Sequence, residues 1–152
     1  MRGFETGLAG KVAIVTGASE GIGKATAQLL FDQQAQVVIC ARRPDVLAEA
    51  AKEIEASGGG GKILAVPADV TRPEDIQRVV DAAVEAFGGI DILINNAGGA
   101  DAGPFLEQTD ERIARDLDLK LFAAIRFTRL VVPHMIQRGG GRIVNVTAIA
   151  GK

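Results

Sequence analysis

The sequence lacks tyrosine and tryptophan and has a single cysteine, Cys40. One cysteine excludes an internal disulfide framework and is typical of a protein from a reducing compartment. No apolar run approaches the length of a membrane span, and residues 1–7 contain no apolar stretch that could serve as a signal peptide. We therefore expect a cytoplasmic protein with no membrane partner.

The sequence also has little net charge, although charged residues make up an ordinary 24% of it. The net charge of -2 provides no basic field, so nucleic acid is not expected as a partner. Hydrophobic residues make up 47% of the 152 residues, which is enough for one domain with an apolar core. We predict a single domain over residues 1–152, and we assign no metal site.

Short apolar runs alternate with amphipathic segments along the whole chain. The predicted strands are residues 11–15, 36–40, 62–66, 90–94 and 142–147. The predicted helices are residues 21–34, residues 44–56, a helix that ends at Phe87, and residues from about 110 to about 138. The first of them has Ile22, Ala25, Leu29 and Leu30 on its apolar stripe. The third begins with a capping box of Thr71 and Glu74. Such alternation predicts an α/β fold, a Rossmann-like doubly wound parallel sheet that is truncated after its fifth strand.

A glycine-rich turn separates the first predicted strand from the first helix. Residues 16–23 read Thr-Gly-Ala-Ser-Glu-Gly-Ile-Gly. Gly17 permits a tight turn, Gly21 lets the backbone approach a diphosphate, and Gly23 allows close packing of helix on strand. The first helix would then present unpaired N–H groups to an anion. Loops collect glycine for other reasons, so the position of this turn at a strand–helix junction is what favours a dinucleotide site.

Three segments together resemble the short-chain dehydrogenase/reductase family. They are the spacing Thr-Gly-x-x-x-Gly-x-Gly of residues 16–23, the Asn-Asn-Ala-Gly of residues 95–98, and Asp69-Val70 after the third strand. In the family, the Asp carboxylate meets the adenine amino group. Taken alone, Asp69 could lead into a helix cap, and the Asn pair could be turn chemistry. The resemblance implies a cofactor-binding set: Gly17, Ser19, Glu20, Gly21, Ile22, Gly23, Arg42, Asp69, Val70, Asn96, Ala97 and Gly98.

The end of the second strand bears on the choice of nicotinamide cofactor. An acidic residue there accepts the ribose hydroxyls of NAD, whereas an arginine accommodates the 2′-phosphate of NADP. Ala41 stands at that position, with Arg42 and Arg43 after it. Guanidinium suits a phosphate dianion because it offers forked donors and stays charged, although two loop arginines could also be simply solvated. Glu20 points the other way, because some NADP-using relatives carry a basic residue there. We predict NADP, with NAD as the alternative.

The resemblance also implies a catalytic set of Asn, Ser, Tyr and Lys, which this sequence does not match. No tyrosine is present, and the family's Tyr-x-x-x-Lys element would fall beyond Lys152. Ala148 stands where the serine belongs, and Lys120 stands at the asparagine position. Thr147 carries a hydroxyl but would face the other way in a strand, and Lys120 could be an ordinary helix lysine. Thr147 and Lys120 stay as candidates, and no catalytic residue is assigned.

Three functions remain open at this point. The first is a family oxidoreductase that transfers hydride between the nicotinamide and an alcohol or carbonyl substrate, with little turnover expected from these 152 residues. The second is a non-catalytic nucleotide-binding module, and the third is an interaction protein that keeps only the fold. Whether the chain is an enzyme is therefore undecided. An exposed parallel edge at the fifth strand favours a homo-oligomer.

Overall fold

A computed structural model describes residues 6–99 and 103–147. The sheet contains β1 (Val12–Thr16), β2 (Gln36–Ala41), β3 (Lys62–Pro67), β4 (Ile92–Asn95) and β5 (Arg142–Asn145). The α-helices are α1 (Gly21–Asp32), α2 (Pro44–Ala56), α3 (Pro73–Phe87), α4 (Asp110–Leu117) and α5 (Ala123–Gln137). Two short elements complete the list, the 3₁₀ turn η1 (Phe105–Glu107) and the π-helical turn η2 (Asp118–Phe122).

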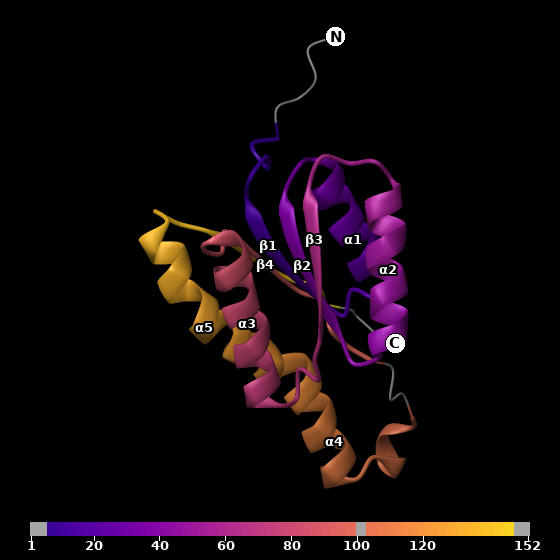
Figure 1. The fold of residues 1–152 in the computed structure, drawn as a ribbon. Coiled ribbons are helices and arrows are strands. Elements are labelled where there is room, and N and C mark those ends of the chain that lie inside the picture. Colours follow the sequence, from indigo (N-terminus) through magenta and orange to yellow (C-terminus); the bar gives the residue numbers. More distant parts are fainter. Residues whose placement is uncertain (1–5, 100–102, 148–152) are drawn as a thin grey trace.

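The five strands form one parallel sheet in the order β3-β2-β1-β4-β5. Every residue of β1 and β4 is buried, because helices cover both faces of a parallel sheet. Figure 1 shows α1 and α2 on one side of the sheet and α3 and α5 on the other. The predicted α/β, Rossmann-like doubly wound sheet is confirmed.

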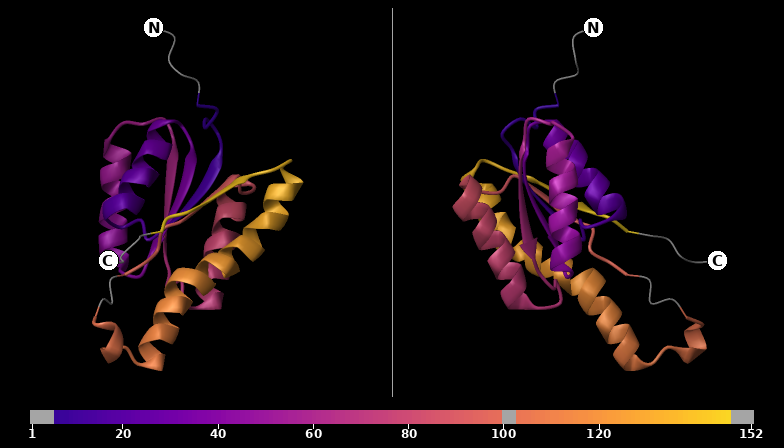
Figure 2. Two further views of the ribbon diagram at one scale, coloured as in Figure 1. Left: turned by 180° about the vertical axis from the view of Figure 1, so that it is seen from behind. Right: turned by 45° about the vertical axis from the view of Figure 1, so that its right-hand side comes forward.

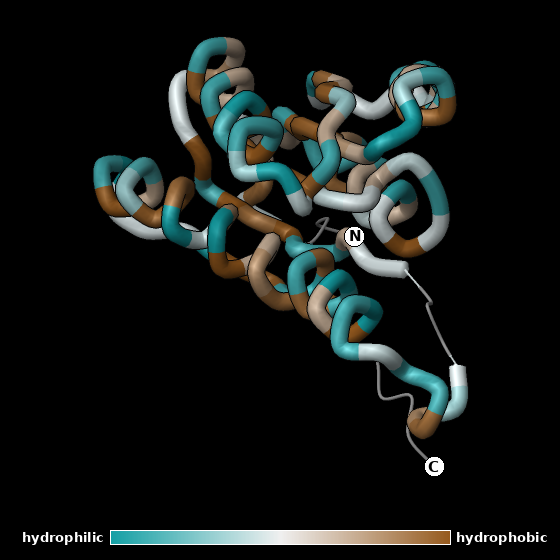
Figure 3. The backbone as a smooth tube through the Cα atoms, turned by 90° about the horizontal axis from the view of Figure 1, so that it is seen from below, coloured by the Kyte–Doolittle hydropathy of each residue, from teal (hydrophilic) through white to brown (hydrophobic). Residues whose placement is uncertain are grey.

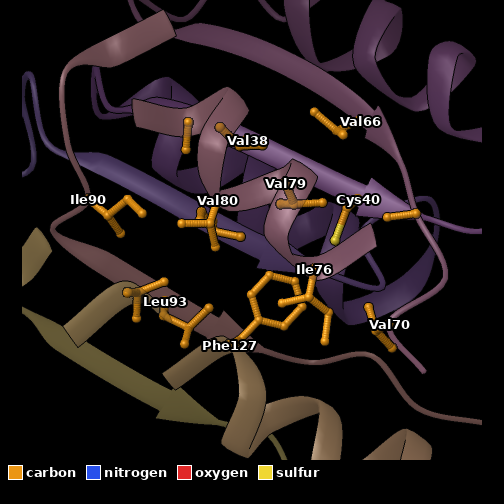
Figure 4. Packing of buried hydrophobic residues seen from close by; sticks show 14 of the residues in the cluster. Val38, Cys40, Val66, Val70, Ile76, Val79, Val80, Ile90, Leu93 and Phe127 are labelled. Atoms are coloured by element: carbon orange, nitrogen blue, oxygen red, sulfur yellow. The ribbon is translucent and has the colours of Figure 1, made fainter. Parts of the chain in front are cut away.

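Two apolar clusters fill the spaces between the sheet and its helices. One joins alternate strand residues such as Ile14 and Leu93 to α3 and α5, with Phe127 at its centre (Figure 4). The other joins the intervening strand residues, such as Val15 and Ile39, to α1 and α2. Figure 3 shows hydrophobic residues concentrated in the strands and recurring along the helices. The period of two along each strand therefore divides the core into two halves.

The predicted apolar stripe of α1 is wrong at three of its four residues, and only Leu30 packs against the core. Ile22 and Leu29 are each 66% exposed, and Ala25 is exposed as well. The residues that face the sheet are Gly23, Ala27 and Phe31, spaced four apart. Gly23 packs so closely on the backbone of Gly17 that this contact fixes the rotation of the helix. The packing of Gly23 at the turn, and not the burial of the larger side chains, thus decides which face of α1 lies against the sheet.

The predicted helix over residues 110–138 is present but interrupted. The π-helical turn η2 separates α4 from α5, and α4 projects beyond the rest of the molecule (Figures 1 and 2). Apolar side chains on this arm face solvent, at Ile113, Leu117, Leu121 and Phe122.

All four residues of the edge strand β5 are exposed too. None of the helices in the described ranges is long and apolar enough to cross a membrane.

A buried carboxylate ties the start of the sheet together. Asp91 precedes β4, and its Oδ2 accepts the backbone N–H of Val12 at 2.9 Å. Its Oδ1 accepts Nε of Arg138, from the end of α5, at 2.9 Å, and Lys11 lies 3.9 Å away. Burial acts to raise the pKa of Asp91, but the hydrogen bonds from Arg138 and Val12 and the two nearby cations outweigh it and lower the pKa.

Asp91→Asn should lower the free energy of unfolding by about 2–3 kcal/mol at neutral pH, because a charged hydrogen-bond acceptor is lost. Urea denaturation of both proteins measures this. Since the folded pKa is lowered, the contribution of the carboxylate is full above its unfolded pKa of about 3.9 and disappears as the pH falls through the folded value. The difference in free energy of unfolding between the native protein and Asp91→Asn should therefore stay constant from about pH 7 to 5 and shrink below about pH 4.

Asp81→Asn is the matched control, since Asp81 lies exposed on α3 and, among the residues that the structure describes, accepts only from the Gln77 amide at 2.8 Å. This change should cost under about 0.5 kcal/mol. An Asp91→Asn protein as stable as the control would show that Asp91 is not an anchor.

Candidate functional site

A cleft of about 470 Å³ opens at the carboxyl ends of the strands. It lies where the chain order reverses, since β2 and β3 follow on one side of β1 whereas β4 lies on the other. Open α/β sheets bind ligands at this switch point. The lining residues are Gly17, Ser19, Glu20, Ala41, Arg42, Arg43, Ala68, Val70, Ala97, Gly98 and Leu119.

The glycine turn forms one wall of the cleft. Gly17 has a φ of +64°, and a Cβ there would lie 2.8 Å from the Cα of Ala97. A Cβ on Gly23 would collide with the carbonyl of Gly17 and the side-chain amide of Asn96. Gly21 has a φ of +57° and nothing within 4 Å of its missing Cβ, so its backbone is open to a ligand. The three glycines therefore occupy the positions that a diphosphate-binding turn requires.

The hydroxyl of Thr16 joins this turn to the end of β4. It donates to the carbonyl of Ile94 at 3.4 Å. It also accepts the backbone N–H groups of Asn96 at 3.0 Å and Ala97 at 2.9 Å. Thr16 is buried, so these groups have little access to water. The sequence marks Thr16 only as part of the turn, and its role as the link between two strands becomes visible in the structure.

The side chain of Asn96 belongs to this network and not to the cleft lining. Its Nδ2 donates to the carbonyls of Thr16 and Gly17, both at 3.1 Å. Asn95 bonds sideways, from its Nδ2 to Oδ1 of Asn145 on β5 at 2.9 Å. Asn96 thus ties its loop to the backbone of the glycine turn, and Asn95 ties β4 to β5. The alternative of local turn chemistry does not describe Asn96, because its side chain bonds backbone 80 and 79 positions away. The predicted contact of Asn96 with a cofactor stays a prediction.

The arginines after β2 differ in their partners. Nη2 of Arg43 donates to Oε2 of Glu20 in an exposed ion pair. Within residues 6–99 and 103–147, no hydrogen bond or ion pair engages the guanidinium of Arg42. Both arginines line the cleft. Arg42 is therefore the arginine of the two whose guanidinium is unengaged within the described residues, so all of its donors are available to an anionic ligand.

Asp69 lies in the chain between Ala68 and Val70, which both line the cleft. Its Oδ1 accepts from the backbone N–H and the hydroxyl of Thr71, at 2.9 and 2.7 Å. The predicted capping box is wrong, because α3 starts at Pro73 with Arg72 as its cap residue. Oδ2 of Asp75 instead accepts the backbone N–H of Asp69 at 2.8 Å. That bond lowers the pKa of Asp75, burial opposes the shift, and Arg78 adds to it.

The π-helical turn η2 supplies the far wall of the cleft through Leu119. Lys120 follows on the same turn but does not line the cleft, and its ammonium lies 2.6 Å from a carboxylate oxygen of Asp116 on α4. Thr147 is exposed and lies beyond β5, which ends at Asn145. Ala148 falls outside the described residues. The structure therefore brings neither catalytic candidate into the cleft.

Seven of the twelve predicted cofactor residues line the cleft, namely Gly17, Ser19, Glu20, Arg42, Val70, Ala97 and Gly98. The other five, Gly21, Ile22, Gly23, Asp69 and Asn96, lie in the turns that shape it. Four further residues line the cleft without belonging to the predicted cofactor set, namely Ala41, Arg43, Ala68 and Leu119. The first three adjoin predicted cofactor residues, whereas Leu119 adjoins only the catalytic candidate Lys120.

Comparison with known proteins places this cleft in context. The sequence model for short chain dehydrogenases matches residues 11–152. The ketoacyl reductase HetN from Nostoc sp. is 40% identical over 147 residues, which is 97% of this chain and 50% of that protein.

Solved structures of dehydrogenases and reductases are similar to this chain as well. L-sorbose reductase from Gluconobacter frateurii, complexed with NADPH and L-sorbose, matches with a TM-score of 0.87 at 41% identity, over 92% of this chain and 53% of that one. A 7α-hydroxysteroid dehydrogenase complexed with NADH and 7-oxo glycochenodeoxycholic acid matches with a TM-score of 0.88 at 35% identity, over 94% and 55%. The chain thus spans about half the length of the relatives that it matches.

Thr16→Val should lower the free energy of unfolding by about 2–4 kcal/mol, because the N–H groups of Asn96 and Ala97 lose their acceptor in a buried place. Thermal or urea denaturation measures the loss. Thr16→Ser keeps the hydroxyl and is the matched control, with an expected loss of about 1 kcal/mol for the missing methyl group. Equal stability of the two variants would show that the hydroxyl does not hold the turn.

Proposed function

The chain belongs to the short-chain dehydrogenase family, and we propose that its cleft binds NADP(H) in preference to NAD(H). The family is one of oxidoreductases that bind nicotinamide dinucleotides. The solved relatives were complexed with NADPH in one case and NADH in the other, so membership alone leaves the choice open. The observation that carries the proposal is Arg42, a cleft arginine with no ion-pair partner among the described residues.

The cleft fits a dinucleotide at each point where its residues can be judged. Gly17 and Gly21 leave backbone exposed where a side chain would fill the turn, and α1 begins at that turn with its N–H groups free for a diphosphate. Arg42 follows the small residue Ala41 at the end of β2 and offers a forked cation to a 2′-phosphate. Position 41, where an acidic residue would favour NAD, is occupied by alanine.

The neighbouring residues complete the proposed site. Oδ1 of Asp69 is occupied by Thr71, and the second carboxylate oxygen is the one we assign to the adenine amino group. Val70 and Leu119 supply apolar walls, and Ala97 and Gly98 supply backbone beside the glycine turn. A bound NADP(H) would supply the hydride, while these residues bind and orient it. We propose that the whole protein interconverts an alcohol and a carbonyl compound. This reaction requires an acid–base group, and the tyrosine that the family resemblance implies for that role is not among these 152 residues.

The outward face of α4 and η2 supports a further part of the proposal, association with a second copy. Ile113, Leu117 and Leu121 follow one another at intervals of four and are each at least 40% exposed. A contiguous exposed apolar stripe is typical of a protein interface. We therefore propose a homo-oligomer that buries this face.

Arg42→Ala should weaken NADPH binding by about 10- to 100-fold, because a charge-assisted contact to the 2′-phosphate is lost. NADH lacks that phosphate, so its affinity should change less than about twofold. Isothermal titration calorimetry with both nucleotides measures this. Arg129→Ala is the matched control, since it removes an exposed arginine of α5 that does not line the cleft. Equal losses for NADPH and NADH, or no loss at all, would contradict the assignment of Arg42.

Turnover can be tested separately from binding. The purified 152-residue chain, supplied with NADPH and a panel of ketones and ketoacyl compounds, should show no oxidation of the nicotinamide above the enzyme-free rate. No tyrosine is present to donate the proton, and the Lys120 ammonium is held by Asp116. Sustained oxidation with any of these substrates would show that another group carries out proton transfer, and the Lys120→Ala and Thr147→Ala variants would then identify it.

A further inference from the structure

Two residues at the mouth of the cleft share an unusual position. Glu20 is the cap residue of α1 and Arg43 is the cap residue of α2, and neither side chain caps its own helix. Instead Nη2 of Arg43 donates to Oε2 of Glu20, across the space between the two helix starts. Both residues line the cleft. The ion pair is therefore part of the cleft wall beside Arg42.

Helix dipoles give the two charges different costs. A carboxylate at the positive, amino-terminal end of α1 is favourable, whereas a guanidinium at the amino-terminal end of α2 is not. The pairing with Glu20 compensates for that cost and neutralises Arg43. Consecutive arginines thus differ in charge environment, since Arg43 is engaged and Arg42 has no ion-pair partner among the described residues.

We propose that the Glu20–Arg43 pair withholds Arg43 from the cofactor and so limits the affinity for NADP(H). This inference rests on the proposed function, because it concerns the same 2′-phosphate. The contact with Glu20 engages one N–H group of Arg43 and holds the guanidinium beside that carboxylate, so the carboxylate and the phosphate compete for the position and the charge of one guanidinium. Glu20 is then a specificity-determining residue that acts through Arg43, in addition to any repulsion of its own.

The strength of the pair sets the expected size of the effect. The side chains of Glu20 and Arg43 are 66% and 62% exposed. Exposed pairs are weak and are screened by salt, so the exchange is possible and its cost is a several-fold change in affinity. Glu20→Gln should therefore tighten NADPH binding by about fivefold at low ionic strength and leave NADH within about twofold.

A double-mutant cycle tests whether Glu20 acts through Arg43. Calorimetry would give the NADPH and NADH affinities of the native chain, Glu20→Gln, Arg43→Ala and the double variant. Arg43→Ala should weaken NADPH binding less than about twofold in the native background, where Glu20 already holds the guanidinium, and about fivefold in the Glu20→Gln background. Glu53→Gln is the matched control. It removes one negative charge from a carboxylate that pairs with Lys24 outside the cleft lining, and it should change NADPH affinity less than about twofold.

The possible results separate this inference from the proposed function. If the two substitutions act independently, so that Glu20→Gln tightens NADPH binding equally with and without Arg43, the carboxylate acts by direct repulsion and competition for Arg43 is overturned. If Glu20→Gln changes nothing while Arg42→Ala still weakens NADPH, the inference fails and the proposed function stands. If neither the native chain nor any variant binds NADPH, both are overturned. Tighter NADPH binding that requires Arg43 supports both.

Discussion

The candidate site depends on the hydroxyl of Thr16. This one group accepts two backbone N–H groups after β4 and donates to the carbonyl of Ile94, so it sets the distance between the ends of β1 and β4. With that distance fixed, Asn96 reaches the carbonyls of Thr16 and Gly17, and no Cβ fits on Gly17 or Gly23. The close contact of Gly23 then orients α1. The shape of the cleft thus follows from a few polar contacts made where the strands end.

The parts of the fold that were predicted are those encoded in short stretches of sequence. The helix over residues 44–56 has the predicted bounds, because Pro44 starts it and a glycine run follows it. The apolar runs alone predicted the bounds of each strand to within one or two residues. Local rules failed where a more distant group offered a better partner. The stripe of α1 shifted because Gly23 packs on Gly17, and the Thr71 cap was displaced because Asp75 bonds the backbone of Asp69.

The same distinction applies to the candidate site. Motif spacing predicted the glycine turn and Arg42, since their roles depend on a strand–helix junction that the sequence shows directly. It could not predict Leu119, because the π-helical turn that carries this residue has no signature in the local sequence. Nor could it predict the Glu20–Arg43 pair. Those residues are 23 positions apart, and they meet only because α1 and α2 start side by side on one face of the sheet.

Binding and chemistry are separable in this chain for a geometric reason. The groups assigned to the nucleotide come from the carboxyl ends of β1 to β4 and from η2, all within the described residues. The two catalytic candidates do not line the cleft, since the Lys120 ammonium lies against Asp116 and Thr147 lies beyond β5. Nucleotide affinity therefore reports on the cleft alone, and substitutions at Arg42, Glu20 and Arg43 can be interpreted without reference to turnover. The proposed preference for NADP(H) therefore depends on which guanidinium is unpaired and not on how many arginines follow β2.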